Sequence, residues 1–183
     1  MAHDRQGGDE SAPHKSKTAL LIIDMISDFE FEDGQRLLRN ALPATRNILR
    51  LKERARAACI PTIYVNDNFG QWRSDFRQLV HRCRNEAVCG EPIARQLMPD
   101  EQDYFVLKPA NSGFFSTPLQ TLLQLIGVET IVLTGVSSHQ CVLFTAADAY
   151  VRNYQLVVPR LRGGEQCEGQ RTRAALLQDR AKG

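Results

Sequence analysis

Short apolar runs alternate with longer amphipathic segments along most of the chain. The runs at 18–23, 62–65, 104–107, 129–134 and 155–158 have the length of strands, and several are apolar on both faces, which is typical of parallel sheets. Helical spacing occurs at 42–58, with Pro43 in the first turn, at 118–126, stopped by Gly127, and at 140–150 and 169–178. This alternation predicts an α/β fold with a three-layer, doubly wound, mostly parallel sheet that has helices on both faces.

The length of 183 residues suits a single domain with its own core. Residues 1–17 are polar and contain Gly and Pro, so they cannot bury enough apolar surface to fold. We therefore expect a disordered tail over 1–17 and one folded domain over 18–183.

Charge and hydropathy exclude several classes of partner. The 23 Lys and Arg are scattered and nearly balanced by 21 Asp and Glu, so we expect no nucleic-acid or anionic-membrane binding. No apolar run approaches the roughly 18 residues of a membrane span, and the first residues lack the apolar part of a secretory signal. These features predict a cytoplasmic protein.

The five cysteines form no Cys-x-x-Cys pair, so neither a disulfide framework nor a zinc ribbon is expected. We interpret Cys59 as a small buried hydrophobic residue. Cys83, Cys89 and Cys167 stand in polar surroundings and carry no predicted role. The sequence around Cys141 alone argues for chemistry.

Three reactive side chains follow predicted strands at the edge where doubly wound sheets bind ligands. Asp24 and Lys108 come directly after apolar runs, and Cys141 lies one loop beyond Thr134. A carboxylate base and an ammonium beside a thiol make a reasonable nucleophilic site. Each residue also has an ordinary explanation: a turn-forming Asp, a solvated Lys and a buried structural Cys.

Cys141 falls in the first turn of the helix predicted after Gly135, with Ser137 or Ser138 as the expected cap. Unpaired N–H groups and the helix dipole lower a thiol pKa at such a position. The pattern therefore favours a reactive thiol over a structural one.

Three segments resemble those of the isochorismatase-like cysteine hydrolases. Residues 19–29 (ALLIIDMISDF) are similar to the family's first strand and turn, 107–114 (LKPANSGF) to its lysine segment, and 133–149 (LTGVSSHQCVLFTAADA) to its nucleophile segment. Order and spacing agree, and the resemblance covers about residues 18–178. It implies the isochorismatase-like hydrolase fold and a catalytic triad of Asp24, Lys108 and Cys141.

The resemblance also implies a mechanism. Asp24 takes the thiol proton, Cys141 attacks the substrate carbon to form a thioester, and Lys108 balances the charges. In these proteins the peptide after the valine of the nucleophile loop is commonly cis, which implies a cis bond between Val136 and Ser137. This loop would direct N–H groups at the oxyanion.

Departures from the family pattern concern metals and the end of the chain. Nicotinamidases of the superfamily carry an Asp-x-His pair and a further His for a metal, whereas residues 66–72 (NDNFGQW) contain no His. We expect no metal and no cofactor. His139 is expected to line the site or to be solvated.

At the end of the chain, residues 158–164 (VPRLRGG) lack the acidic residue usual in relatives, and no closing strand follows. An uncovered sheet edge predicts a homo-oligomer, a dimer or tetramer.

The substrate pocket is the least determined feature. Candidates for a small, partly aromatic pocket are Phe29, Asn68, Phe69, Trp72 and Phe114, although each could instead serve packing. We expect a small-molecule substrate with an amide, carbamoyl or ureido C–N bond. A vinyl-ether hydrolase and a non-catalytic binding or assembly member stay as alternatives. A flavodoxin-like nucleotide binder is disfavoured because no Gly-rich phosphate loop follows any strand.

Overall fold

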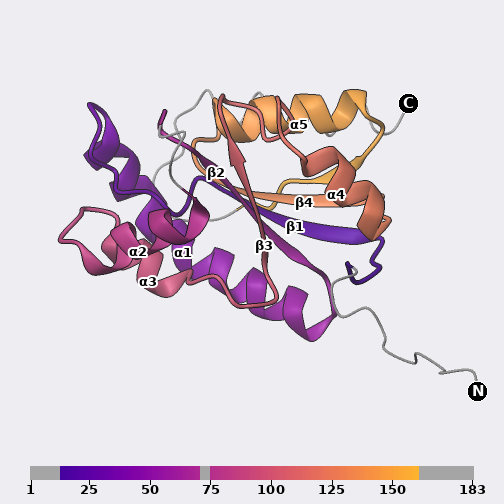
Figure 1. Cartoon of the computed structure of the whole chain (residues 1–183), viewed down its shortest axis with the longest axis horizontal. Helices are drawn as coiled ribbons and strands as arrows, with labels where there is room; N and C mark the ends of the chain where they lie inside the picture. The colour runs from indigo at the N-terminus through magenta and orange to yellow at the C-terminus, as the bar shows by residue number, and fades with distance from the viewer. Residues whose placement is uncertain (1–12, 71–74, 161–183) are drawn as a thin grey trace, which may run out of the picture.

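The computed structural model describes residues 13–70 and 75–160, and a five-stranded parallel sheet forms its centre (Figure 1). The strands are β1 (Thr18–Ile23), β2 (Thr62–Asp67), β3 (Tyr104–Lys108), β4 (Thr130–Gly135) and β5 (Gln155–Val157). They lie in the order β3-β2-β1-β4-β5, and every neighbouring pair is parallel. The predicted fold class and all five predicted strands are confirmed.

Helices cover both faces of the sheet. One face carries α1 (Gly34–Ala57), α2 (Phe76–Asn85) and α3 (Glu91–Gln96), and the other carries α4 (Leu119–Ile126) and α5 (Cys141–Val151) (Figure 1). Alternate residues of β1 enter the two cores: Leu21 and Ile23 pack on the α4–α5 side, and Leu20 and Ile22 on the other. Both faces of β1 are therefore buried, which is why its sequence is a continuous apolar run.

The first helix begins earlier than predicted. It starts at Gly34 instead of Leu42, and Pro43 lies inside it instead of in its first turn. Buried Ala41, Ile48 and Ala55 recur every seven residues and keep one helix face on the sheet across the proline. Packing of this face outweighs the hydrogen bond that a proline removes.

The sequence pattern missed α2 and α3. In α2, Phe76 and Cys83 are buried on one face, and the Asp75 carboxylate caps the helix by accepting a hydrogen bond from the Gln78 N–H at 2.8 Å. This cap before an apolar i, i+7 pair was the available signal.

Two cysteine expectations are wrong. Cys59 is exposed, because it follows the end of α1 with a positive φ of 54°, and Cys83 is buried in the core beneath α2. Cys167 and the helix predicted at 169–178 lie outside the described residues.

The described residues just before β1 contact the folded domain. The Ser16 N–H donates to the carbonyl of Ile126 at 3.0 Å, and the Lys17 carbonyl accepts from Thr130 at 2.9 Å. At the far edge of the described sheet, β5 pairs only with β4. The homo-oligomer stays a prediction.

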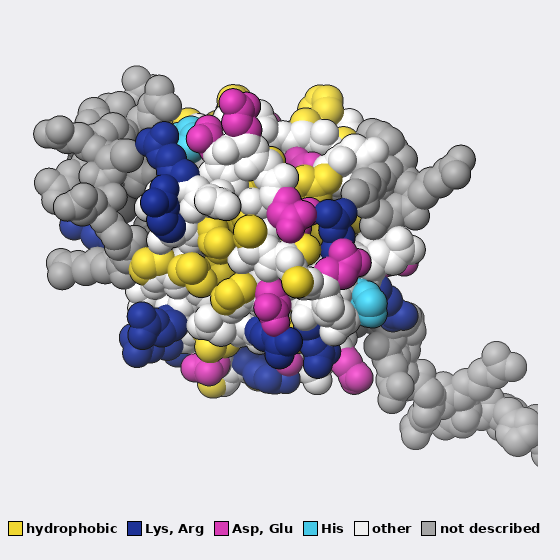
Figure 2. Space-filling view, turned by 90° about the vertical axis from the view of Figure 1, so that its left-hand side faces the viewer, with side chains coloured by type: hydrophobic (Ala, Val, Ile, Leu, Met, Phe, Trp, Pro, Cys, Tyr) yellow, Lys and Arg dark blue, Asp and Glu magenta, His cyan; other side chains and the backbone are white. Residues whose placement is uncertain are grey.

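The described surface gives two further observations. Over residues 13–70 and 75–160, no helix combines the length and apolar character that crossing a membrane requires. Acidic and basic side chains lie interspersed on the face shown in Figure 2, so that face carries no broad region of one charge.

A close backbone approach at the end of β4 fixes the start of the loop that joins β4 to α5. Gly135 has a φ of 118°, and a Cβ at this position would lie 2.0 Å from the Ile23 carbonyl oxygen. The next residue, Val136, donates its N–H to that same oxygen at 3.0 Å. Only glycine allows β1 and β4 to meet in this way.

We predict that Gly135→Ala destabilises the protein by about 3 kcal/mol or more, because backbone strain and a backbone clash act together. Gly127→Ala is the matched control: Gly127 also has a positive φ, 88°, but open space at its Cβ position. The control should cost about 1–2 kcal/mol. Denaturant unfolding measures both, and equal losses would contradict the proposed contact.

Candidate active site

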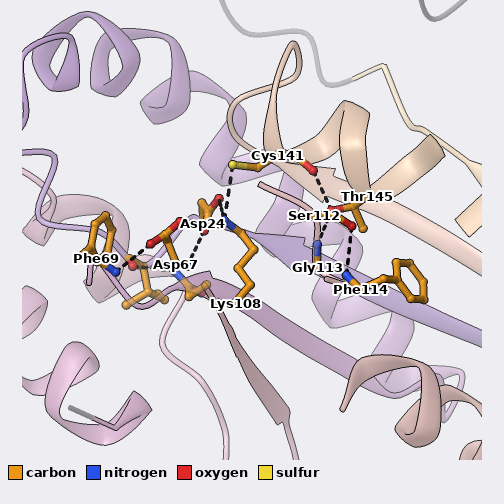
Figure 3. Close-up of polar contacts among 11 residues, drawn as sticks. Asp24, Asp67, Phe69, Lys108, Ser112, Gly113, Phe114, Cys141 and Thr145 are labelled. Carbon is orange, nitrogen blue, oxygen red and sulfur yellow. Dashed lines mark hydrogen bonds and ion pairs between the residues drawn. The ribbon is translucent and has the colours of Figure 1, made fainter. Parts of the chain in front are cut away.

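Three of the predicted site residues meet at the carboxyl edge of the sheet (Figure 3). The Lys108 ammonium lies 3.0 Å from Oδ2 of Asp24 and 3.5 Å from Sγ of Cys141. Lys108 is the last residue of β3, Asp24 follows β1, and Cys141 is the first residue of α5. The fold therefore brings Asp24, Lys108 and Cys141 together from three separate elements.

Asp24 is held in place by backbone contacts to β2. Its φ of 51° is left-handed, a conformation that Asp tolerates better than most residues. Its N–H donates to the Val65 carbonyl at 2.9 Å, and its Oδ1 accepts from the Asp67 N–H at 2.7 Å. The other carboxylate oxygen is thereby turned toward Lys108.

A second carboxylate, which the sequence analysis did not assign to the site, contacts the same lysine. Oδ2 of Asp67 lies 3.2 Å from the Lys108 ammonium (Figure 3). Asp67 is the last residue of β2 and pairs in register with Lys108. The signal was available, because Asp67 stands at a strand end just as Asp24 and Lys108 do.

Lys108 is completely buried, so its charge is balanced entirely by neighbouring groups. Burial is the largest single effect on its pKa and acts to lower it. The attraction of Asp24, Cys141 and Asp67 together outweighs burial, and the pKa of Lys108 is raised above its usual value. Lys108 is thus a charged ammonium at neutral pH.

The neighbours of Cys141 favour its protonated form. Burial, followed by the negative charge and hydrogen bond of Asp24, raises the pKa of the Cys141 thiol to about 12, although Lys108 acts in the opposite direction. Burial also raises the pKa of Asp24, with Lys108 and Cys141 opposing the shift. The site thus combines a thiol whose protonated form is favoured with the Lys108 ammonium and the side chains of Asp24 and Asp67.

This result corrects the expected lowered thiol pKa. The carboxylate of Asp24 and the loss of water around the sulfur outweigh the nearby ammonium. The predicted helix cap is also wrong. Gln140, not Ser137 or Ser138, is the N-cap residue, and its side chain makes no capping hydrogen bond.

The loop between β4 and α5 caps α5 through its backbone. The Val136–Ser137 peptide bond is cis, and the Ser137 carbonyl accepts the N–H groups of Gln140 at 3.1 Å and Val142 at 3.2 Å. His139, at the loop's tip, is exposed. The loop thus joins β4 to the first turn of α5, where the thiol stands.

A hydrogen-bond network ties the segment after Lys108 to α5 (Figure 3). The buried Thr145 hydroxyl donates to the Cys141 carbonyl at 2.7 Å and accepts from the Gly113 N–H at 2.9 Å. One turn farther along α5, Asp148 accepts a hydrogen bond from the Ser112 hydroxyl. These bonds fix the helix that carries Cys141 against the strand end that carries Lys108.

The residues expected to line a substrate pocket separate into three groups. Phe29 and Phe114 are buried in the two cores, at 1% and 5% exposure. Asn68 and Phe69 line a surface cavity of about 510 Å³. Trp72 lies outside the described residues.

The 510 Å³ cavity adjoins the cluster of Asp24, Lys108 and Cys141 without containing it. Of the four charged and sulfur groups at the site, only Asp67 is among its described lining residues, which also include Asp28 and Arg82. The rest of its described lining reaches into α2, and Cys141 is not among these residues.

Metal ligands are sparse over residues 13–70 and 75–160. No three His, Cys, Asp or Glu side chains there gather in a group that could hold a metal ion. At the site itself, the carboxylates of Asp24 and Asp67 both contact the Lys108 ammonium.

Comparisons with known proteins agree with this geometry. A model of the isochorismatase domain matches residues 18–160. The "uncharacterized isochorismatase family protein YaaI" of Bacillus subtilis is 42% identical over 146 residues, which cover 80% of each chain. The "probable inactive nicotinamidase" At3g16190 of Arabidopsis thaliana is 32% identical over 148 residues, with 75% of this chain and 74% of the relative covered.

Comparison with a solved structure shows that the two proteins share the same fold. The N-carbamoylsarcosine amidase of Thermoplasma acidophilum is 26% identical, superposes with a TM-score of 0.65, and covers 88% of this chain and 92% of its own. Since the family model and a relative with 42% identity both span most of the described residues, the protein belongs to the isochorismatase family of hydrolases.

Proposed function

We propose that this protein is a cysteine hydrolase that cleaves a small amide, carbamoyl or ureido C–N bond with Cys141 as nucleophile. The single observation that carries the proposal is the fully buried Lys108 ammonium within 3.5 Å of Cys141 Sγ and 3.0 Å of the Asp24 carboxylate. A nucleophile, a base and a fixed positive charge within contact distance are the parts that acyl transfer to a thiol requires.

In the first step, Asp24 accepts the thiol proton as the Cys141 sulfur attacks the carbonyl carbon. The raised pKa of Asp24 suits this role, since a carboxylate with a raised pKa is a better base. Because the thiol pKa is about 12 in the free protein, proton transfer accompanies attack instead of preceding it. The Lys108 ammonium offsets the negative charge that develops on sulfur.

In the second step, the C–N bond breaks and Asp24 returns the proton to the departing nitrogen, which leaves as ammonia or an amine. The acyl group stays on Cys141 as a thioester. Water activated by the regenerated Asp24 carboxylate then attacks the thioester, releases a carboxylic or carbamic acid and restores the thiol.

The oxyanion that forms during attack needs donors beside the sulfur. We assign this role to the loop at Val136 and Ser137 and to the start of α5. The Ser137 carbonyl accepts the N–H groups of Gln140 and Val142, so we assign the oxyanion to the backbone N–H of Cys141, which lies between them in the chain. Backbone N–H groups at a helix start are well suited to a developing negative charge.

The substrate class rests on the relatives. The structurally similar protein of Thermoplasma acidophilum is named an amidase, which supports a C–N bond. The Arabidopsis relative is named as probably inactive, so a non-catalytic role is the alternative that the activity test must address.

We predict that a screen of small primary amides, ureides and N-carbamoyl compounds finds a substrate that releases ammonia. Cys141→Ala should abolish release, by about 1,000-fold or more, because the residual oxyanion donors cannot form the thioester. Cys59→Ser, which removes an exposed cysteine away from the site, is the matched control and should retain full activity. Activity that survives Cys141→Ala would refute the assigned nucleophile, and a wholly negative screen would favour the non-catalytic alternative.

A second prediction concerns the pH dependence of thiol reactivity in a Cys59→Ser background. Because the pKa of Cys141 is raised to about 12, its alkylation by iodoacetamide should be slow at pH 7 and should keep accelerating up to pH 10 and beyond. Lys108→Met should slow alkylation at pH 9 by about tenfold or more, since a nearby opposite charge is worth roughly 1 to 3 pKa units.

Peptide mapping by mass spectrometry assigns the alkylated cysteine, and circular dichroism confirms that the Lys108→Met protein is folded. A Cys141 alkylation rate that is the same with lysine or methionine at position 108 would show that the ammonium does not act on the sulfur.

A further inference from the structure

The Lys108 ammonium has three N–H donors and three partners, one for each donor. Two are the carboxylates of Asp24 and Asp67, at 3.0 and 3.2 Å, and the third is the Cys141 sulfur at 3.5 Å. Lys108 is fully buried, and these are the three side-chain contacts of its ammonium within residues 13–70 and 75–160. The attractions of these three groups together therefore determine where the ammonium lies.

The position of Asp67 beside Lys108 is fixed by hydrogen bonds and by strand pairing. Its Oδ1 accepts the Phe69 N–H at 2.7 Å, which orients the carboxylate, and its own N–H donates to Asp24 at 2.7 Å. Its register partner on β3 is Lys108 itself, and the Asn68 N–H donates to the Lys108 carbonyl at 3.1 Å. The backbone thus holds Asp67, Asp24 and Lys108 as one unit.

Asp24 and Asp67 have different roles in the proposed reaction. Asp24 gives up its negative charge when it takes the thiol proton, and at that moment its attraction for the ammonium falls. Asp67 has no contact with the thiol among the described hydrogen bonds, so the thiol proton passes to Asp24 and not to Asp67. It is the one remaining anion of the pair that can hold Lys108 charged and in place.

We propose that Asp67 is a positioning residue that shares the Lys108 ammonium with Cys141, drawing its positive charge away from the sulfur in the free protein and anchoring the lysine while Asp24 carries the proton. This inference rests on the proposed function, because it assumes that Cys141 is the nucleophile. It assigns to Asp67 no contact with substrate.

The test measures Cys141 alkylation by iodoacetamide against pH in the Cys59→Ser background and requires no substrate. Asp67→Asn keeps the acceptor for the Phe69 N–H but removes the charge, so the ammonium moves to the sulfur and the thiolate becomes easier to form. Alkylation at pH 8 should become about tenfold faster or more, the opposite direction from Lys108→Met. Asp67→Glu, which keeps the charge, should leave the rate within about threefold of the parent.

Asp28→Asn is the matched control. Asp28 also lines the 510 Å³ cavity and also accepts a hydrogen bond from the N–H two residues ahead, at 3.1 Å, but its carboxylate pairs with Arg82 instead of Lys108. Its removal should leave the alkylation profile unchanged. Asp67→Ser is a second neutral variant. The alkylation rate is compared in whichever of the two neutral variants shows a cooperative thermal unfolding transition.

An unchanged or slower rate in a folded neutral variant, or an equal acceleration in Asp28→Asn, overturns the role of Asp67. Failure of the proposed function is a separate result, since it appears as hydrolysis that survives Cys141→Ala and leaves the alkylation comparison intact.

Discussion

One buried positive charge organises the carboxyl edge of this sheet. An ammonium without solvent contact is unfavourable by several kcal/mol unless it is paired and hydrogen-bonded. Lys108 meets that requirement with two carboxylates and a sulfur, contributed by the ends of β1 and β2 and by the start of α5. Removing either carboxylate leaves the charge partly uncompensated, so the site's components depend on one another.

The surrounding backbone serves this arrangement. Gly135 lets β4 approach β1 closely enough for the Val136 N–H to donate to the Ile23 carbonyl, which fixes where the loop between β4 and α5 begins. Thr145 then ties the first turn of α5 to the segment that follows Lys108. These contacts lie outside the cluster of Asp24, Asp67, Lys108 and Cys141, and they fix the position of the thiol.

Much of the architecture could be predicted from the sequence because it depends on local pattern. The five strands are short apolar runs, and the three reactive residues stand where such runs end, so sheet topology alone brings Asp24, Lys108 and Cys141 to one edge. The start of α1 was missed because Pro43 suggests a first turn, whereas tertiary packing of Ala41 and Ile48 carries the helix across it.

The electrostatics of the site could not be predicted in this way. A helix start beside a lysine suggests an acidic thiol, and the opposite direction results from burial and from Asp24, which depend on three-dimensional distances. Asp67 was missed for a similar reason: an aspartate at a strand end is ordinarily a turn former. The strand-end position alone does not separate these two readings, whereas the register that places Asp67 opposite Lys108 gives the contact between them.

The central claim, that Lys108 is a permanently charged group held between carboxylates and sulfur, can be measured without a substrate. The chain has five lysines, so NMR of protein labelled at the lysine side chains gives a sparse spectrum, and Lys108→Met identifies the Lys108 signal. Titration should show Lys108 protonated throughout the neutral range and losing its proton at a higher pH than the lysine signals that titrate normally. A Lys108 side chain that is neutral at pH 7, or that titrates below the other lysines, would contradict the account.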